Sequence, residues 1–549
     1  MSQQQLIVDI EGMSCSGCEA PVVAALQSVP GVSRAVASFA DGVAHVQVEP
    51  EVDPGVLEKA VGRAGYTGKV RLTEKKSGTG RSRDTDFDLV VLGGGSAGFA
   101  AAIKGVESGA RVALVNNGIL GGTCVNVGCI PSKALIRAAE ANHRRQHHGF
   151  SGVPTTSGTS NWPLVRGQKD ALVKDLRQAK YWNVLESYPD ISLFEQRGTV
   201  GANATVTLDD TTILRTGKII VATGSSPHVA SVPGLAEAGF LDSTTAMDLE
   251  TLPQSLIVIG ASLVGMELCQ MFARLGARVT VLSRRSVVLP QEDPGIGDAL
   301  TRYLRDEGLD IVHDVTIERV ERNGDYTVHY VKDGSRATVS GEQLLMATGR
   351  RANTDGCGLD VAGIELGQKG EIVVDDHLQA TNPDVYAAGD VTGDPMHVYV
   401  AAYAGALAAE NALGGNGRHY DVSAVPRVTF TDPAAAAVGM TEVQAREKGL
   451  DPITSVLPLE HVPRALAAHD TRGFVKLVAD AGTRRILGAH ILAAEAGEMI
   501  MEPTLAIKFG LTIEDLTSTF HPYLTLSEAI KLAAQTFDKD VSQLSCCAA

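Results

Sequence analysis

The sequence predicts an α/β fold with two Rossmann-like nucleotide-binding domains, an α+β C-terminal domain and a ferredoxin-like domain at the N-terminus. Residues 88–105 and 255–272 each run from an apolar strand through a glycine-rich turn into an amphipathic helix, which is the pattern of a dinucleotide-binding unit. Residues 1–72 alternate between strand and helix patterns in the order βαββαβ, which is typical of a ferredoxin-like domain. From Val422 the chain is rich first in strand and then in helix patterns, so we expect a separate α+β domain there.

The N-terminal unit is predicted in most detail. We expect strands at residues 6–10, 32–39, 43–49 and about 69–72, and helices at residues 19–29 and up to residue 64. The residues that follow are polar and charged and contain Gly and Ser, which predicts a flexible linker. The predicted boundaries are 1–72 for the ferredoxin-like domain, 73–85 for the linker, 86–245 and 353–421 for the two parts of the first nucleotide-binding domain, 246–352 for the second, and 422–549 for the C-terminal domain.

The composition indicates a globular protein. The chain has 549 residues, of which 44% are apolar and 20% charged, and its formal net charge is −16 at pH 7. This charge argues against nucleic acid and anionic lipid as partners. The start of the chain lacks the pattern of a signal peptide, and no run of about 18 apolar residues suggests insertion into a membrane. We therefore expect a soluble cytoplasmic protein.

The first glycine-rich turn has the spacing GxGxxG, formed by Gly93, Gly95 and Gly98. The first glycine permits a tight turn, the second lets a pyrophosphate approach backbone N–H groups at a helix N-terminus, and the third allows close helix packing. An acidic residue that would hold the ribose hydroxyls is missing at the end of the next strand. Asn116 stands there, so we expect this contact to be neutral or displaced.

The second turn has the spacing GxSxxG, formed by Gly260, Ser262 and Gly265. The strand after it ends in Arg284 and Arg285 instead of an acidic residue. An acid at this place would accept the ribose 2′-hydroxyl of NADH, whereas guanidinium groups pair with the 2′-phosphate of NADPH. The sequence therefore favours NADPH. The alternative is that the arginines only solvate the end of a strand.

Six of the eight cysteines form three close pairs. Cys124 and Cys129 lie directly before a predicted helix whose first turn carries Pro131. The positive end of that helix lowers the pKa of a thiol and favours a reactive thiolate. Two further cysteines, Cys269 and Cys357, stand alone, and we expect them to be small buried apolar residues.

The segment GGTCVNVGCIPSK, residues 121–133, resembles the redox cysteine pair of the flavin-dependent disulfide reductases, and the resemblance extends from about Asp86 to the end of the chain. It implies FAD at the first turn and a path of electrons from NADPH through the flavin to the cysteines. It also implies that Cys129 faces the flavin, that Cys124 faces the substrate, and that Lys133 and Glu267 form an ion pair near the flavin. The residues expected to contact FAD are Gly93, Gly95, Ser96, Gly98, Asn116, Gly122, Thr123, Lys133, Thr223, Gly224 and Asp390, and those on the NADPH side are Gly260, Ser262, Gly265, Glu267, Arg284, Arg285 and Gly349.

Two positions depart from the pattern of ordinary members of this family. Such members end in a segment like HPTLSE, in which the histidine is an acid/base. This chain has HPYLTLSE at residues 521–528, and alignment on TLSE places Tyr523 at the position of the histidine and His521 two residues upstream. A phenol with a pKa near 10 is a poor proton shuttle at pH 7, so the usual disulfide exchange is disfavoured. Leu263 stands where relatives often carry a tyrosine over the flavin.

The remaining cysteine pairs suggest a metal substrate. Cys15 and Cys18, in the segment GMSCSGC, resemble the metal-binding loop of copper and mercury transport domains, where two thiolates suit a soft cation. Cys546 and Cys547 add two thiolates near the C-terminus. With the central pair, these features resemble the mercury-reducing members of the flavin-dependent disulfide reductases.

This resemblance implies that Hg(II) passes between thiolate pairs by ligand exchange, from Cys15 and Cys18 or a cellular thiol complex to Cys546 and Cys547, and then to Cys124 and Cys129. It also implies a homodimer in which each tail serves the flavin site of the partner, with Tyr523 holding a thiolate or orienting the ion. One alternative is an ordinary disulfide reductase similar to lipoamide dehydrogenase. Another is a protein that only binds and delivers a soft metal, and copper stays open for the N-terminal unit.

Overall fold

The computed structural model describes residues 4–13, 18–39, 42–48, 52–71 and 85–543. The chain forms two compact units, Met1–Asp84 and Thr85–Ala549, which are described separately. The linker predicted for residues 73–85 lies, apart from Thr85, outside the described residues.

The N-terminal unit has the predicted order βαββαβ. Its antiparallel sheet has the strand order β2-β3-β1-β4, and apolar side chains of the strands pack against the two helices. Asp53 begins the second helix by accepting a hydrogen bond from the N–H of Gly55 (2.9 Å), directly before Pro54. The elements are β1 (Gln4–Glu11), α1 (Glu19–Gln27), β2 (Val32–Ser38), β3 (Val43–Val48), α2 (Pro54–Arg63) and β4 (Thr67–Arg71).

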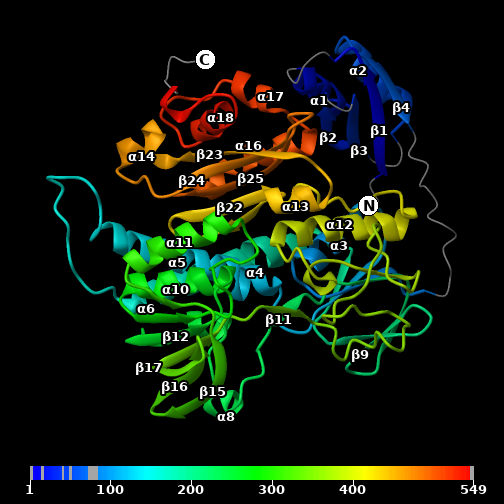
Figure 1. Ribbon diagram of the computed structural model, residues 1–549. Helices are drawn as coiled ribbons and strands as arrows, with labels where there is room; N and C mark the ends of the chain where they lie inside the picture. Colours follow the sequence, from blue (N-terminus) through cyan, green and yellow to red (C-terminus); the bar gives the residue numbers. More distant parts are fainter. Residues whose placement is uncertain (1–3, 14–17, 40–41, 49–51, 72–84, 544–549) are drawn as a thin grey trace. The chain divides into compact units, whose positions relative to one another are not determined.

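The first nucleotide-binding domain is built on a seven-stranded sheet (Figure 1). Its centre is parallel, because the apolar strands β7, β6, β5 and β10 lie side by side and β20 adds to β10. The strands are β5 (Phe87–Leu92), β6 (Val112–Val115), β7 (Ile191–Phe194), β8 (Gly198–Gly201), β9 (Thr205–Leu208), β10 (Ile213–Val221) and β20 (Val385–Ala387).

Two of this domain's helices lie in close contact. Gly405 on α12 (Val398–Gly414) would place a Cβ only 2.0 Å from the carbonyl oxygen of Ala97 on α3 (Ser96–Glu107), so the backbones of the two helices touch there. The other helical segments are α4 (Gly122–Val127), α5 (Cys129–Arg144), α6 (Trp162–Arg177), a π-helical turn (Gln178–Trp182), α7 (Asn183–Ser187) and the 3₁₀ turn η3 (Asp390–Thr392).

Two short antiparallel strands, β11 (Ser225–Pro227) and β19 (Arg350–Ala352), pair where the chain enters and leaves the second nucleotide-binding domain. Its parallel sheet has the order β14-β13-β12-β18, and a separate antiparallel sheet has the order β15-β16-β17. The elements are α8 (Leu235–Ala238), α9 (Ser243–Met247), β12 (Ser255–Ile259), α10 (Leu263–Leu275), β13 (Arg278–Leu282), α11 (Pro294–Asp306), β14 (Asp310–Val312), β15 (Thr316–Asn323), β16 (Asp325–Lys332), β17 (Ser335–Gly341) and β18 (Gln343–Met346).

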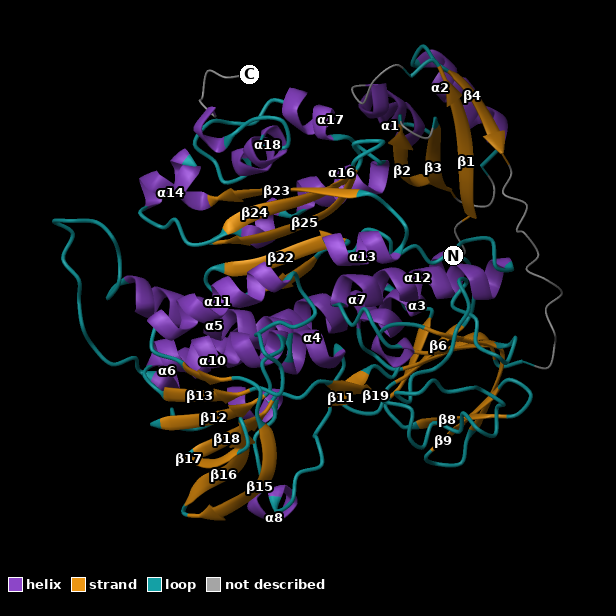
Figure 2. Cartoon of the chain, in the orientation of Figure 1, coloured by secondary structure: helices purple, strands orange, loops and turns teal. Residues whose placement is uncertain are grey.

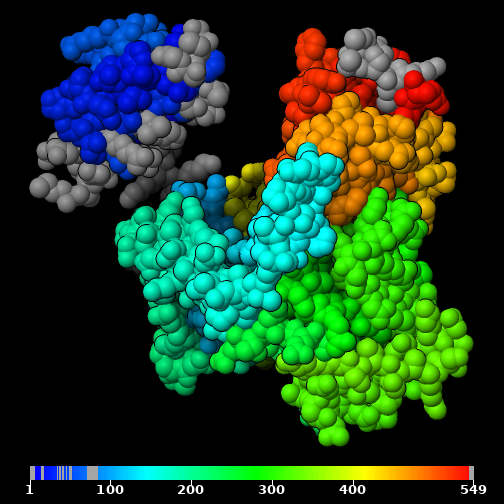
Figure 3. Space-filling model, turned by 90° about the vertical axis from the view of Figure 1, so that its left-hand side faces the viewer, coloured from blue at the N-terminus to red at the C-terminus, as the bar shows by residue number. Residues whose placement is uncertain are grey.

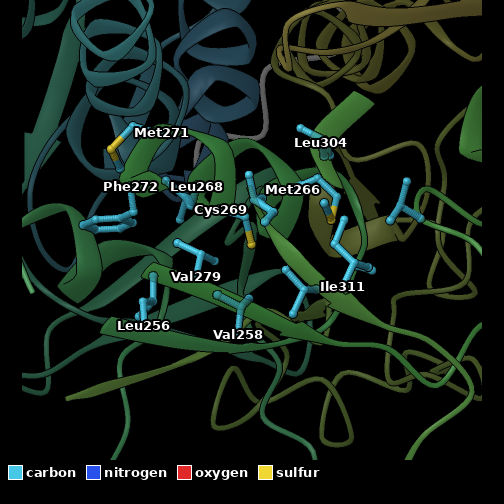
Figure 4. Close-up of a cluster of buried hydrophobic side chains, with 14 of the residues drawn as sticks. Leu256, Val258, Met266, Leu268, Cys269, Met271, Phe272, Val279, Leu304 and Ile311 are labelled. Carbon is cyan, nitrogen blue, oxygen red and sulfur yellow. The ribbon is translucent and has the colours of Figure 1, made fainter. Parts of the chain in front are cut away.

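The largest apolar cluster fills the space between α10 and this parallel sheet. Figure 4 shows Cys269 pointing into it among Leu256, Val258 and Val279. The side chain of Cys269 is fully buried, and burial raises the pKa of its thiol. Cys269 is therefore the buried apolar residue that the sequence predicts, and Cys357 is buried as well.

The C-terminal domain is an antiparallel sheet with the order β21-β22-β25-β24-β23, and one face of this sheet packs against the last four α-helices (Figure 2). Its elements are β21 (Arg427–Thr429), β22 (Ala434–Gly439), α13 (Glu442–Glu447), β23 (Pro452–Pro458), the 3₁₀ turn η4 (Leu459–His461), α14 (Pro463–Ala468), β24 (Phe474–Asp480), β25 (Ile486–Ala493), α15 (Ala496–Met499), α16 (Met501–Phe509), α17 (Ile513–Ser518), α18 (Glu528–Gln535) and the 3₁₀ turn η5 (Val541–Gln543).

A loop of the first domain reaches the C-terminal domain. The loop between α5 and α6, cyan in Figure 3, lies against orange residues of the C-terminal domain, and the rings of Phe150 and His469 are 4.7 Å apart there. Among the helices that the structure describes, none has the combined length and apolar composition needed to cross a membrane.

Candidate active site

A cavity of about 810 Å³ runs along the first nucleotide-binding domain to the start of the second. A volume of this order accommodates a large cofactor. The residues that line it include the first glycine turn, both central cysteines, the start of α12 and the turn after β21. Of the predicted site residues, the cavity brings together Gly93, Gly95, Ser96, Asn116, Gly122, Thr123, Cys124, Cys129, Lys133, Thr223, Gly224, Glu267 and Asp390.

The first glycine turn has no room for side chains at two of its three positions. Gly93 has φ +111°, and a Cβ there would lie 2.2 Å from the carbonyl oxygen of Ala222. A Cβ on Gly98 would lie 1.8 Å from the carbonyl oxygen of Gly93. At Gly95, by contrast, the nearest atom is 3.6 Å away, and α3 starts at the next residue. The turn therefore presents open backbone N–H groups and a helix N-terminus to the cavity, which fits a dinucleotide pyrophosphate.

Asn116 braces this turn. Its Oδ1 accepts a hydrogen bond from the N–H of Gly94 (2.9 Å), and its Nδ2 donates to the carbonyl oxygen of Gly118 (2.9 Å). Both polar groups of the amide are thus used within the protein. This explains why a neutral amide stands where an acid is more usual, and a contact from Asn116 to a ribose stays a prediction.

Cys124 and Cys129 lie on two successive helices. Cys124 is in α4, and Cys129 is the first residue of α5, after a break at Gly128. The structure thus places Cys129 at the helix N-terminus itself, whereas the sequence placed both cysteines before the helix.

The two thiols have opposite pKa shifts. A hydrogen bond from the thiol of Cys124, the charge of Lys133 and the backbone N–H at the helix start lower the pKa of Cys129 to about 7. The same hydrogen bond, burial and the negative charge of Cys129 raise the pKa of Cys124. In the reduced pair, Cys129 is therefore the sulfur that loses its proton more easily, and Cys124 is the one that holds its proton more tightly.

Lys133 and Glu267 form the expected ion pair, with Lys133 Nζ 2.7 Å from Glu267 Oε2. The other carboxylate oxygen of Glu267 accepts a hydrogen bond from the N–H of Phe430 (2.8 Å), and the ammonium lies 4.6 Å from the centre of the Phe430 ring. Glu267 is only 2% exposed, so these partners satisfy a buried charge. The pair fixes α5, α10 and the start of the C-terminal domain around the cysteines.

Asp390 lies at the start of η3 and is held by a chain of polar groups. Ser225 Oγ donates to its carboxylate (2.6 Å), and Arg350 Nε donates to Ser225 Oγ (2.7 Å). Arg350 also donates to the carbonyl oxygen of Ser225 (2.7 Å). Ser225 lies in β11 and Arg350 in β19, the two paired strands between the domains, so these hydrogen bonds hold Asp390 at the junction of the two nucleotide-binding domains.

The second glycine turn repeats the geometry of the first outside the cavity. Gly260 has φ +117°, and a Cβ there would lie 2.2 Å from the carbonyl oxygen of Ala347; a Cβ on Gly265 would lie 2.6 Å from that of Gly260. Ser262 precedes the first residue of α10. Arg284 and Arg285 are exposed directly after β13, so their guanidinium groups are accessible to an anion.

Several predicted residues are not brought to the cavity. Tyr523 lies between α17 and α18, is 55% exposed and does not line the cavity of its own chain. His521 pairs with Glu502, with 2.7 Å between Nε2 and Oε1. Cys18 lies directly before α1. The predictions for Cys15, Cys546 and Cys547 fall outside the described residues.

Sequence reasoning missed Ser225, Arg350 and Tyr399. Tyr399 lines the cavity at the start of α12, and its hydroxyl donates to the carbonyl oxygen of Pro426. Burial raises the pKa of Tyr399 to about 12. No local motif marks these residues, because each acts on a partner far away in the chain.

The glycine turn, the cysteine pair at a helix N-terminus and the two nucleotide-binding domains define a class of redox enzyme. The chain matches the pyridine nucleotide-disulphide oxidoreductases over residues 87–405, their dimerisation domain over residues 425–534 and the heavy-metal-associated domain over residues 7–67. It belongs to the pyridine nucleotide-disulphide oxidoreductase family, and it is an oxidoreductase that uses FAD and NAD(P)H. The dimerisation domain indicates a homodimer.

Within this family the chain is similar over its whole length to mercuric reductases. It is 44% identical to the mercuric reductase of Staphylococcus aureus, with 100% of both chains covered. The corresponding identity is 42% for Lysinibacillus sphaericus, over 98% of this chain and 99% of the relative. Among solved structures, the HOCl-induced flavoprotein disulfide reductase RclA of Escherichia coli is 31% identical over 82% of this chain and 99% of its own, with a TM-score of 0.73.

Proposed function

We propose that this protein reduces Hg(II) to volatile Hg(0) and thereby detoxifies mercury. The placement of both Cys124 and Cys129 in the wall of a cavity large enough for a dinucleotide is the observation that carries the proposal. The full-length similarity to proteins named mercuric reductase supports the choice of metal. When bound, FAD together with NADPH supplies the pair of electrons that Hg(II) needs to become Hg(0).

The cysteine pair is suited to holding Hg(II). A soft cation prefers thiolate ligands, and an incoming thiolate displaces an outgoing one stepwise, as in thiol–disulfide exchange. Cys124, which is proposed to face the substrate, bonds to the ion as its proton passes along the hydrogen bond to Cys129. Cys129 then becomes the second ligand, and its proton leaves with the thiol that the ion releases. Neutral Hg(0) has little affinity for thiolate and leaves.

Cys546 and Cys547 are proposed to deliver the ion to this pair from the partner subunit. The dimerisation domain supports this assignment, because it indicates a second subunit to whose site the two cysteines could be supplied. Tyr523 is exposed and away from its own cavity, as a residue that serves the partner's site would be. Its proposed role is to hold a thiolate or orient the ion, without proton transfer.

The N-terminal unit is proposed to capture Hg(II) with Cys15 and Cys18. Its match to heavy-metal-associated domains supports a soft-metal site there. We further propose that the protein works in the cytoplasm. The residues that the sequence assigns to FAD and NADPH are proposed to contact these nucleotides. The domain boundaries predicted from the sequence are also proposed to be those of the folded protein.

The test is release of Hg(0) vapour from thiol-bound Hg(II) on addition of NADPH. Cys124→Ala and Cys129→Ala are each expected to abolish the release of Hg(0). The double variant Cys546→Ala/Cys547→Ala is expected to lose most of it. As a control, folded Cys269→Ala keeps its activity, because this thiol is buried away from the cavity. Turnover only on lipoamide or oxidised glutathione would identify an ordinary disulfide reductase, and Hg(II) binding without vapour would identify a binding protein.

A further inference from the structure

Two histidines and an aspartate meet on the surface of the first nucleotide-binding domain. Asp376 and His377 lie in the turn between the bridge partners Val374 and Ala380, and His419 lies beyond the C-terminal end of α12. His419 Nδ1 is 2.7 Å from one carboxylate oxygen of Asp376, and His377 Nε2 is 3.5 Å from the other. The three potential ligand atoms all lie within 4.8 Å of one another. Two imidazoles therefore flank one carboxylate.

The ring of His377 is already oriented for a ligand. Its Nδ1 is 2.9 Å from the carbonyl oxygen of Arg418, which can only accept a hydrogen bond, so Nδ1 carries a proton and Nε2 is the ring nitrogen that faces the cluster. Histidines that bind metals in proteins use the same arrangement, in which the second ring nitrogen donates to a carbonyl or carboxylate.

Hydrogen bonds from a buried asparagine hold the backbone around the cluster. Asn411, which is 1% exposed, donates to the carbonyl oxygens of His377 (2.9 Å) and Arg418 (2.8 Å) and accepts from the N–H of Arg418 (3.0 Å). The N–H of Tyr420 donates to the carbonyl oxygen of Asp376 (2.7 Å). The two segments that carry the ligands are thus fastened before any ion binds.

The neighbouring charges leave Asp376 available. The carboxylate of Asp375 accepts backbone N–H groups of its own turn, from His377 and Gln379. Arg418 is paired with Glu410 (2.9 Å), which draws its guanidinium group away from the cluster. Among the interactions described for Asp376, its carboxylate serves the two imidazoles.

We propose that Asp376, His377 and His419 bind one borderline divalent transition-metal ion of the Zn²⁺ class. Imidazole and carboxylate ligands suit such ions, whereas Hg(II) prefers thiolates. Bonds of about 2.0–2.1 Å place tetrahedral ligands roughly 3.4 Å apart. Small side-chain rotations and release to water of the proton on His419 Nδ1, which now faces the Asp376 carboxylate at 2.7 Å, complete the site, with water as the fourth ligand.

This ion lies far from the reaction. The N-terminal end of α12 lines the cavity at Val398 and Tyr399, and the cluster follows its C-terminal end. A helix of this length spans about 25 Å. A bound ion would therefore add a further link between the turn at residues 375–379 and the segment after α12, and it takes no part in the transfer of electrons.

The experiment compares the FAD-loaded full-length protein with the double variant His377→Gln/His419→Gln. After treatment with a chelator, both are dialysed against Zn²⁺ and the bound metal is counted. Because the cysteines bind Zn²⁺ equally in both, the difference isolates this site, and the variant is expected to bind one ion fewer. With Co²⁺ as the probe, the difference spectrum is expected to show d–d bands without a thiolate charge-transfer band.

His461→Gln is the matched control, because His461 is another histidine paired with a carboxylate, that of Glu460 at 3.5 Å, and it is expected to leave the metal count unchanged. Asp376→Asn, which keeps the size of the side chain, is expected to weaken Zn²⁺ binding at least tenfold even if the double variant does not fold. Equal metal counts in wild type and double variant, unchanged affinity in Asp376→Asn, or a thiolate band in the difference spectrum overturns the proposal.

Discussion

The ammonium group of Lys133 lies 2.7 Å from the carboxylate of Glu267, so an ion pair connects the helix that begins with Cys129 to α10 of the second nucleotide-binding domain. Both charges act on the same thiol. The charge of Lys133 lowers the pKa of Cys129 and that of Glu267 raises it. The lysine therefore stabilises the thiolate, and the carboxylate keeps the lysine in place.

Replacing Lys133 by Met is expected to raise the pKa of Cys129 by roughly one unit, because a nearby opposite charge shifts a pKa by about that amount or more. The measurement is the pH dependence of alkylation of the reduced enzyme. Lys104→Met is the control, since Lys104 forms an ion pair of the same length with Glu410 elsewhere in the domain. An unchanged alkylation profile in Lys133→Met would exclude the electrostatic role.

The rate of alkylation in the unmodified protein should itself report the thiolate. With a pKa of about 7 for Cys129, the rate is expected to rise about tenfold per pH unit below pH 7 and to level off above it, because only the deprotonated sulfur reacts. Cys124, whose pKa is raised, should react slowly over the same range. Peptide mapping after brief alkylation distinguishes the two sulfurs, and preferential labelling of Cys124 would reverse the assignment.

Gly98→Ala is expected to prevent FAD binding and to lower the free energy of unfolding by about 1–3 kcal/mol, because the new methyl group would lie 1.8 Å from the carbonyl oxygen of Gly93. Flavin absorbance of the purified protein and chemical unfolding measure the two effects. Gly167→Ala is the control, since nothing lies within 4 Å of its Cβ position in α6; it should stabilise the helix by about 0.5–1 kcal/mol. Full flavin content in Gly98→Ala would contradict the claim that the turn has no room for a side chain at residue 98.

The features that sequence patterns predicted correctly are local, whereas the ion pair of Lys133 with Glu267, 134 positions apart, was predicted only from the resemblance to a family. The glycine-rich turn with Gly93 and Gly98 and the helix next to Cys129 depend on residues a few places apart, although Cys129 proves to be the first residue of that helix and not a residue before it. Ser225, Arg350 and Phe430 were not predicted. Arg350 reaches Ser225 across 125 positions and the N–H of Phe430 reaches Glu267 across 163, and no periodic pattern carries information over such separations.

The arginines after β13 provide a test of cofactor choice. Arg284→Ser/Arg285→Ser is expected to raise the KM for NADPH roughly 10- to 100-fold and to leave that for NADH nearly unchanged, because charged hydrogen bonds to the 2′-phosphate would be lost. Steady-state kinetics with both nucleotides measures this. Arg278→Ser, at the other end of the same strand and also exposed, is the control. Equal changes in KM for NADPH and NADH would mean that the two arginines only interact with solvent and do not bind the 2′-phosphate.

The contact between the second nucleotide-binding domain and the C-terminal domain depends on a buried charge network. Arg274, 9% exposed, pairs with Glu307 (2.7 Å) and Asp432 (2.8 Å), and Arg472 bridges the same two carboxylates. Arg274→Met leaves two mostly buried carboxylates, whose side chains are 11% and 15% exposed, with one fewer partner, so it should lower the free energy of unfolding by about 3–5 kcal/mol.

Denaturant unfolding measures this loss, and Arg336→Met is the matched control. Arg336 pairs with Glu318 at 3.2 Å, but its side chain is 82% exposed, so water screens the pair and the change should stay within about 0.5 kcal/mol. Equal losses in Arg274→Met and Arg336→Met would mean that burial does not set the strength of the network. A loss confined to Arg274→Met would show that burial gives the network its strength and that the network stabilises the contact between the two domains.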